Sequence, residues 1–316
     1  TDFIPDYSLS TYSFYAVEKW QRRKLNMEFG FRFDQQEMQV SKLIDRQYQN
    51  FEHNFQAYTA NAGLAYELGE GHQLRANMVF VQRPPAINEL YSDGLHHGTA
   101  TLEFGDPNLE EEKSYGANVT YNMVHKKWKY EVYAYTQFIE DFIYLRPDGL
   151  ELTIRGAYPS YQWSNANALV QGIDQKINYQ IQSNLEWETR ASLLRGTNRS
   201  DDNFLINMPS NRLENRITFR KSMKEKEAVS RLQIGSQSVF KQERFNDDEF
   251  AEPPETYHLL FASASYTLKI NDAQSLEFGL RFDNILDTVY REYLNRFRFY
   301  ADEQGRNITL RIKYNF

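Results

Sequence analysis

The chain has 316 residues, a formal net charge of -7 and no cysteine. The lack of cysteine excludes disulfides and thiolate metal sites, and the negative charge argues against nucleic acid as a partner. No run of about 18 apolar residues occurs, so the sequence predicts no membrane-spanning helix. Tyrosine and phenylalanine occur 22 times each. Such an aromatic content in a polar chain is typical of a transmembrane β-barrel, whose apolar outer band is ringed with aromatic side chains.

The predicted elements are strands along the whole chain, beginning with one over residues 12–20. Apolar and polar side chains alternate in about thirteen segments of roughly ten residues, the length that a tilted strand needs to cross a bilayer. Alternation gives each strand one apolar and one polar face. In the last strand we expect Ile308, Leu310 and Ile312 to face outward. The clearest segments are residues 25–33, 74–80, 173–181, 213–219, 276–282 and 308–316.

Short and long connections alternate between these strands. The short ones are residues 21–23, 69–72, 125–127, 222–227 and 271–274. The long ones are residues 35–54, 84–113, 146–168, 197–210, 242–256 and 285–306. An up-and-down barrel of the outer membrane has this alternation, whereas a soluble β-sandwich has no reason to keep it. We therefore expect an all-β fold, a transmembrane antiparallel β-barrel wall, forming one domain over residues 1–316.

Three passages resemble the TonB-dependent outer-membrane receptors. The first box is residues 83–91 (RPPAINELY), where a predicted strand ends. The second box is residues 105–114 (GDPNLEEEKS), where the next strand begins. The third passage is residues 284–294 (NILDTVYREYL), followed by a last strand ending in Phe316. The first two are similar to the paired boxes that flank a long outer loop in haem, zinc and siderophore receptors of this family.

The resemblance implies a location in the bacterial outer membrane and a barrel of about 22 strands with a plug in its lumen. Since about thirteen strands match the later part of such a barrel, a chain opening at Thr1 is expected to be the C-terminal portion, without the plug. The first and last strands run in the same direction, so we expect an open, curved wall with an exposed edge. The implied partners are outer-membrane lipid, a TonB-type energy-coupling protein that contacts the absent plug, and a small metal-containing ligand.

The loop between the first two boxes carries the best candidates for ligand binding. His96 and His97 are adjacent there, and glycines on both sides would let both imidazoles reach one metal ion. The resemblance adds that haem and zinc receptors of this family often carry a ligand histidine between these boxes. The alternative is a solvated histidine pair in a surface loop.

Oxygen donors near the histidine pair extend the candidate set. Asp93, Glu103 and Asp106 lie in or beside the same loop, and a zinc site without cysteine takes about four nitrogen or oxygen ligands. Tyr293 lies in the third passage, where metal- and haem-type relatives often have histidine. A tyrosine at this position counts against a metal site and leaves an iron chelate open, and its phenol is a further candidate for contact with such a ligand.

The function predicted from these features is active import of a metal or metal chelate, with haem, a ferric siderophore or zinc as the transported ligand and no intrinsic cofactor. The alternatives are a passive porin, a barrel-type outer-membrane enzyme and a soluble β-sandwich binding module. An enzyme is not expected, because the sequence has no nucleophile elbow with a serine near a histidine.

Overall fold

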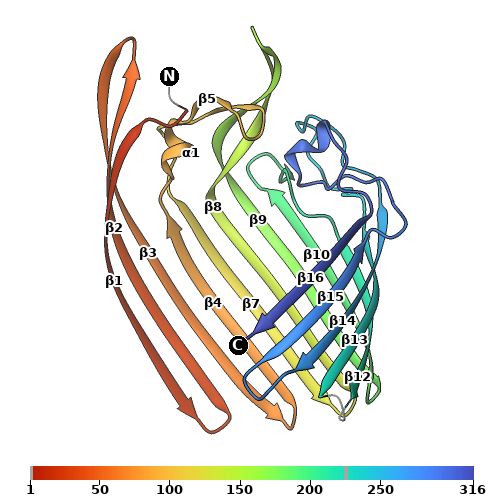
Figure 1. Ribbon diagram of the computed structural model, residues 1–316. Helices are drawn as coiled ribbons and strands as arrows, with labels where there is room; N and C mark the ends of the chain where they lie inside the picture. Colours follow the sequence, from red (N-terminus) through yellow and green to blue (C-terminus); the bar gives the residue numbers. More distant parts are fainter. Residues whose placement is uncertain (1–2, 224–226) are drawn as a thin grey trace.

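The computed structural model describes residues 3–223 and 227–316. Thirteen strands follow one another in an antiparallel meander, and three short strands attach to it (Figure 1). The meander predicted from the sequence is therefore confirmed. In chain order its strands are β1 (Asp6–Arg22), β2 (Leu25–Ile44), β3 (Gln47–Gly69), β4 (His72–Arg83), β7 (Glu112–His125), β8 (Trp128–Thr153), β9 (Gly156–Gln182), β10 (Leu185–Asn198), β12 (Arg212–Met223), β13 (Ala228–Val239), β14 (Tyr257–Lys269), β15 (Ser275–Asp283) and β16 (Asn307–Asn315).

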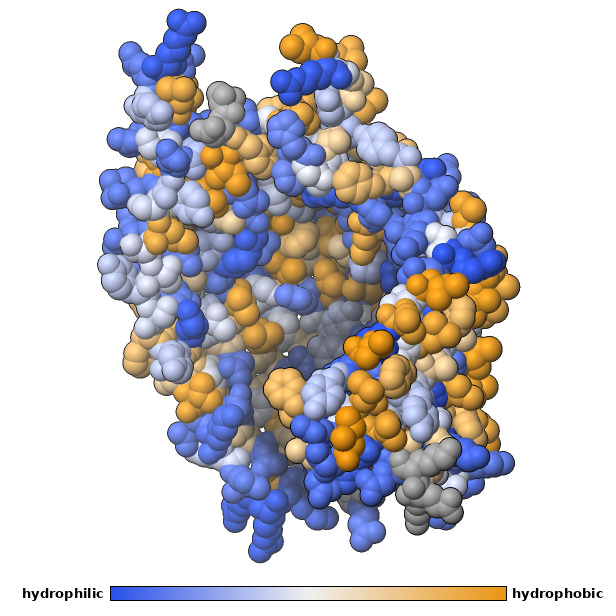
Figure 2. Space-filling view, viewed as in Figure 1, coloured by the Kyte–Doolittle hydropathy of each residue, from blue (hydrophilic) through white to orange (hydrophobic). Residues whose placement is uncertain are grey.

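The sheet curves into a wall and does not close on itself. Among the described residues, β1 pairs only with β2 and β16 pairs only with β15. Figure 1 shows the two end strands at separate edges of the wall, and Figure 2 shows the hollow between them. The expected open edge is confirmed, and it leaves unpaired backbone groups along both end strands.

The outward face of the last strands is apolar. Ile308, Leu310 and Ile312 are 59%, 72% and 63% exposed. They stand opposite Phe282, Leu280 and Phe278 of β15, so apolar side chains form continuous rows across the sheet. Thr309 and Arg311, which alternate with them, line a hollow on the other face of the sheet together with Arg281. The predicted outward orientation of these three residues is confirmed. Within the described ranges, no helix is long and apolar enough to cross a membrane.

Short turns join the strands at one end of the wall, as predicted. Residues 23–24, 70–71 and 126–127 form two-residue turns, and Arg23, Gly71 and Lys126 have positive φ, as tight hairpin turns require. The predicted turn over residues 222–227 includes residues 224–226, which lie outside the described residues. The long connections gather at the opposite end, here called the loop end (Figure 1).

Two of the predicted long loops are wrong. Residues 35–54 and 146–168 continue the ladders β2–β3 and β8–β9 as hairpins that project beyond the loop end. The β2–β3 hairpin turns at Asp45–Arg46, and the β8–β9 hairpin turns at residues 154–155. These parts of the strands extend past the apolar outer band. The alternation of apolar and polar residues that marks a lipid-facing strand is therefore lost there, although the inter-strand hydrogen bonds continue.

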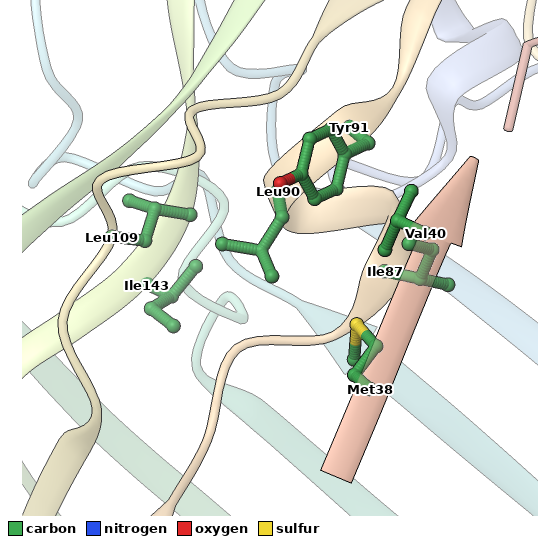
Figure 3. Close-up of a cluster of buried hydrophobic side chains, with 7 residues drawn as sticks. All are labelled: Met38, Val40, Ile87, Leu90, Tyr91, Leu109 and Ile143. Atoms are coloured by element: carbon green, nitrogen blue, oxygen red, sulfur yellow. The ribbon is translucent and has the colours of Figure 1, made fainter. Parts of the chain in front are cut away.

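A small apolar core at the loop end fixes the long connection between β4 and β7 (Figure 3). The short helix α1 (Ile87–Tyr91) in this connection turns Ile87, Leu90 and Tyr91 into the core. The extended part of β2 contributes Met38 and Val40, and β8 contributes Ile143. Leu90 is 1% exposed and Val40 2% exposed. Burial of these side chains holds the connection against the two projecting hairpins.

Candidate functional site: the β4–β7 loop

The connection of residues 84–111, here called the β4–β7 loop, contains three ordered elements. After α1 come β5 (Asp93–His96) and β6 (Thr101–Phe104), which pair as a small antiparallel hairpin. β6 also pairs in parallel with residues 160–162 of β9. His96 therefore lies on a hairpin attached to the main sheet, and His97 follows directly after β5.

The two sequence boxes meet at the base of this loop. Arg83 at the end of β4 forms ion pairs with Glu89 of α1, at 2.9 Å, and with Glu112 at the start of β7, at 2.7 Å. Both carboxylates are largely buried, with side chains 11% and 14% exposed. Glu89 also accepts a hydrogen bond from the backbone N–H of Ala86 at 2.7 Å. Arg83 thus clamps the exit of one strand to the entry of the next.

Gly105 and Asp106 of the second box complete this base. A Cβ on Gly105 would come within 2.4 Å of the backbone nitrogen of Tyr91, so only glycine fits between α1 and the returning chain. Its N–H donates to the carbonyl of Ser92 at 2.8 Å. The Asp106 side chain accepts from the N–H of Asn108 at 2.9 Å in an Asx turn. Asp106 is therefore used in the turn and does not join the histidines.

His96 is held from one side of its ring. Its Nδ1 lies 2.8 Å from Oγ1 of Thr99 and 3.3 Å from Oε1 of Glu103. The imidazole stacks on Phe3, with ring centroids 5.1 Å apart. The described polar contacts of the His96 ring are all at Nδ1, and none is at Nε2. His97 follows the end of β5 and is exposed.

Glu103 is the buried carboxylate of the site. Its side chain is 7% exposed, and Oε1 accepts from Thr101 at 3.1 Å and from Nη1 of Arg296 at 2.8 Å. Arg296 belongs to the 3-10 helix η2 (Arg296–Phe299) in the connection between β15 and β16. One guanidinium, that of Arg296, and one hydroxyl, that of Thr101, therefore support the carboxylate that faces His96.

Asp93 does not join this cluster. On β5 successive side chains alternate, so Gly94 and His96 share one face with Glu103, and Asp93 points to the other. There it forms an ion pair with Lys42 of β2 at 3.1 Å. The expectation that Asp93 and Glu103 would both lie beside the histidines is met by Glu103 alone.

Tyr293 occupies a different part of the loop end. It is 4% exposed, donates a hydrogen bond from its hydroxyl to Glu249 at 2.5 Å, and lies under the guanidinium of Arg298 at 4.4 Å from its ring centroid. Burial, followed by the contact with Glu249, raises the pKa of the Tyr293 phenol. In this conformation the phenol packs the loops together and is closed to a ligand.

The described residues do not form a complete metal site by themselves. Within residues 3–223 and 227–316, no group of three or more histidine, cysteine, aspartate or glutamate side chains is placed to hold a metal ion. His96 and Glu103 are brought together as expected, and Asp93, Asp106 and Tyr293 are not. Arg296 was not predicted as part of this cluster, because its contact with Glu103 joins residues far apart along the chain.

The fold is that of an outer-membrane β-barrel wall. Its strands form a meander with an apolar outer face, and they are joined by short turns at one end and by long ordered connections at the other. The family described as "TonB dependent receptor-like, beta-barrel" matches residues 1–285, and the chain belongs to this family. The resemblance noted in the three sequence passages is thereby confirmed, together with the outer-membrane location.

Solved structures of transporters and receptors share this fold. The "Copper transporter OprC" is 17% identical, with a TM-score of 0.81, over 98% of this chain and 48% of that one. BauA, the ferric preacinetobactin receptor from Acinetobacter baumannii, is 15% identical, with a TM-score of 0.66, over 98% of this chain and 43% of that one. The FrpB iron transporter from Neisseria meningitidis is 10% identical, with a TM-score of 0.64, over 99% of this chain and 45% of that one. The chain thus spans about half the length of these solved relatives.

Proposed function

We propose that this barrel wall belongs to an active importer of a metal ion or metal chelate, energised by a TonB-type coupling protein in the complete receptor. The observation that carries the proposal is the geometry of His96. A metal-ligating histidine commonly directs its second ring nitrogen at a carboxylate, which fixes the ring and raises its basicity as a ligand. Nδ1 of His96 bonds Oγ1 of Thr99 at 2.8 Å and lies 3.3 Å from Glu103, so that carboxylate would support the imidazole in this way and leave Nε2 for the metal.

In this proposal His96 and His97 bind the metal ion directly, and Glu103 supports the His96 imidazole without binding the metal. Two imidazoles leave a transition-metal ion short of the four ligands that zinc or copper usually takes. The remaining donors would come from the ligand's own chelating groups or from other parts of the complete receptor. Asp93 and Tyr293 would stabilise the surrounding loops, through Lys42 and Glu249 respectively.

Copper is the ligand we propose first. Imidazole suits copper, and copper(II) forms the most stable complexes among the divalent first-row metals with a given set of nitrogen and oxygen ligands. The structural similarity to a copper transporter supports this choice, since its TM-score of 0.81 exceeds those of the two iron-related structures, 0.66 and 0.64. Zinc, haem and a ferric siderophore are the other ligands of the proposal, and the test below separates them.

The test is ligand binding to the purified complete receptor, with copper(II), zinc(II), haemin and a ferric siderophore as separate probes. Replacing His96 and His97 together by alanine should weaken binding of the cognate metal about 10–100-fold. His125→Ala is the matched control, because His125 is exposed and is the last residue of β7, at the end of the wall opposite the loop end. Equal affinity of the double variant and the wild-type receptor for all four probes would contradict the proposal.

A further inference from the structure

The carboxylate of Glu103 joins two connections that are far apart in the sequence. On one side it faces Nδ1 of His96 at 3.3 Å, within the β4–β7 loop. On the other side it accepts a hydrogen bond from Nη1 of Arg296 at 2.8 Å. Arg296 lies in the connection of residues 284–306, here called the closing loop, 193 positions further along the chain. One buried oxygen, Oε1, makes both contacts, so replacing either partner should change the contact that Glu103 makes with the other.

The closing loop is anchored independently of Glu103, which makes Arg296 a fixed support. Arg298 of the same 3-10 helix forms an ion pair with Glu249 at 3.1 Å, and both side chains are almost fully buried, at 6% and 4% exposure. Glu292 at the start of the closing loop accepts from Tyr257 at 2.5 Å and pairs with Arg212 at 2.8 Å. These contacts tie the closing loop to Glu249, to Tyr257 of β14 and to Arg212 of β12, and the first of them is made by η2 itself.

The energetic role of Arg296 follows from the burial of its partner. Glu103 keeps only 7% of its side chain exposed, so its charge needs a compensating donor. Without the guanidinium, the carboxylate would keep only the Thr101 hydroxyl and the nearby His96 as partners, and its position beside Nδ1 of His96 would be less well fixed. Arg296 also lies 6.0 Å from the ring centroid of Tyr161 in β9, the strand that pairs with β6 around Glu103.

We propose that Arg296 is a positioning residue for metal binding by His96, acting through Glu103, and that it links ligand binding in the β4–β7 loop to the closing loop. This inference rests on the proposed function. By thermodynamic linkage the effect is reciprocal: if Arg296 favours the metal-bound arrangement of His96, the bound metal stabilises the contact between the two loops. The metal should therefore order η2, although η2 supplies none of its ligands.

The experiment compares four single variants of the complete receptor, His96→Ala, Arg296→Gln, Arg296→Lys and Glu103→Gln, and the double variant that combines His96→Ala with Arg296→Gln. Copper(II) affinity is measured by competition titration. Amide hydrogen exchange of residues 296–300 is measured with and without copper(II). Arg306→Gln is the control, because Arg306 lies in the same closing loop but donates to the carbonyl of Ile285 and not to Glu103. Heat-modifiable migration on gels reports that each barrel is folded.

We expect Arg296→Gln and Glu103→Gln to weaken copper binding about 10-fold, the lower end of the effect of losing an outer-shell partner. Arg296→Lys should weaken copper binding less than Arg296→Gln does, because lysine keeps the positive charge but lacks the planar set of donors of a guanidinium. Combining Arg296→Gln with His96→Ala should add little to the loss from His96→Ala alone, since both act on one contact. Copper should slow exchange in η2 of the wild type and the control, and not in Arg296→Gln.

Two outcomes would overturn the inference and are distinguishable from each other. If His96→Ala weakens copper binding while Arg296→Gln binds like the wild type and keeps the copper-dependent protection of η2, Arg296 has no positioning role and the proposed function stands. If His96→Ala itself binds copper like the wild type, the proposed site fails, and the role of Arg296 fails with it.

Discussion

Replacing Arg83 by alanine should open the base of the β4–β7 loop. Arg83 bridges Glu89 and Glu112, whose side chains are 11% and 14% exposed, while its own side chain is 39% exposed. Removing one partner of a fully buried pair costs about 3–5 kcal/mol, and an exposed pair contributes at most about 1 kcal/mol. Because the two carboxylates are buried and Arg83 is partly exposed, we expect the loss of Arg83 to make opening of the β4–β7 loop easier by about 2 kcal/mol.

A change of this size is measurable by amide hydrogen exchange in the detergent-solubilised complete receptor. Since 1.4 kcal/mol corresponds to a factor of ten, the amides of residues 87–106 should exchange about 30-fold faster in Arg83→Ala. Arg291→Ala is the matched control, because Arg291 pairs with Asp302 at 2.6 Å in the closing loop. Unchanged exchange over residues 87–106 in Arg83→Ala would refute the idea that the paired boxes clamp this loop.

Three further predictions concern the loop core and the membrane face. Gly105→Ala should speed exchange across α1, at an overpacking cost of about 1–3 kcal/mol, because its Cβ would lie 2.4 Å from the Tyr91 nitrogen. Burial lowers the pKa of His53, which bonds the Tyr91 hydroxyl at 2.7 Å. Because the folded protein favours neutral His53, its contribution to the stability of the loop core should be present above about pH 6.5 and decline below it. Amide exchange across α1 should therefore rise on acidification in the wild type and not in His53→Phe. Ile234→Arg, at a site 56% exposed on the outer face, should destabilise the barrel in lipid vesicles by about 2–4 kcal/mol; denaturant titration should give a smaller loss for the neighbouring Gln233→Arg.

The membrane part of the fold could be predicted because lipid imposes a strict pattern on each strand. Ile308, Leu310 and Ile312 alternate with polar residues, and this alternation alone identifies the strand and its outward face. The same signal fails above the membrane. Around Met38 and Val40 the strand leaves the lipid, its apolar side chains pack against α1, and the pattern reads as a loop although the ladder with β3 continues.

The candidate site could be predicted only in part, for a related reason. A histidine pair between glycines is visible in the sequence, and Glu103 lies close enough along the chain to be proposed as its neighbour. Whether Asp93 joins the pair depends on which face of β5 it occupies, and that follows from the register with β6. The support from Arg296 depends on how two distant connections fold over one another, and no local pattern encodes it.

Metal binding at His96 is tested most directly by anomalous X-ray scattering from crystals of the complete receptor soaked with copper(II), measured on both sides of the copper absorption edge. We expect an anomalous peak about 2.0–2.1 Å from Nε2 of His96, the distance typical of imidazole–metal bonds, with Glu103 still facing Nδ1. Copper peaks elsewhere in the lumen, with no density at His96, would contradict the assignment of the β4–β7 loop as the metal-binding element.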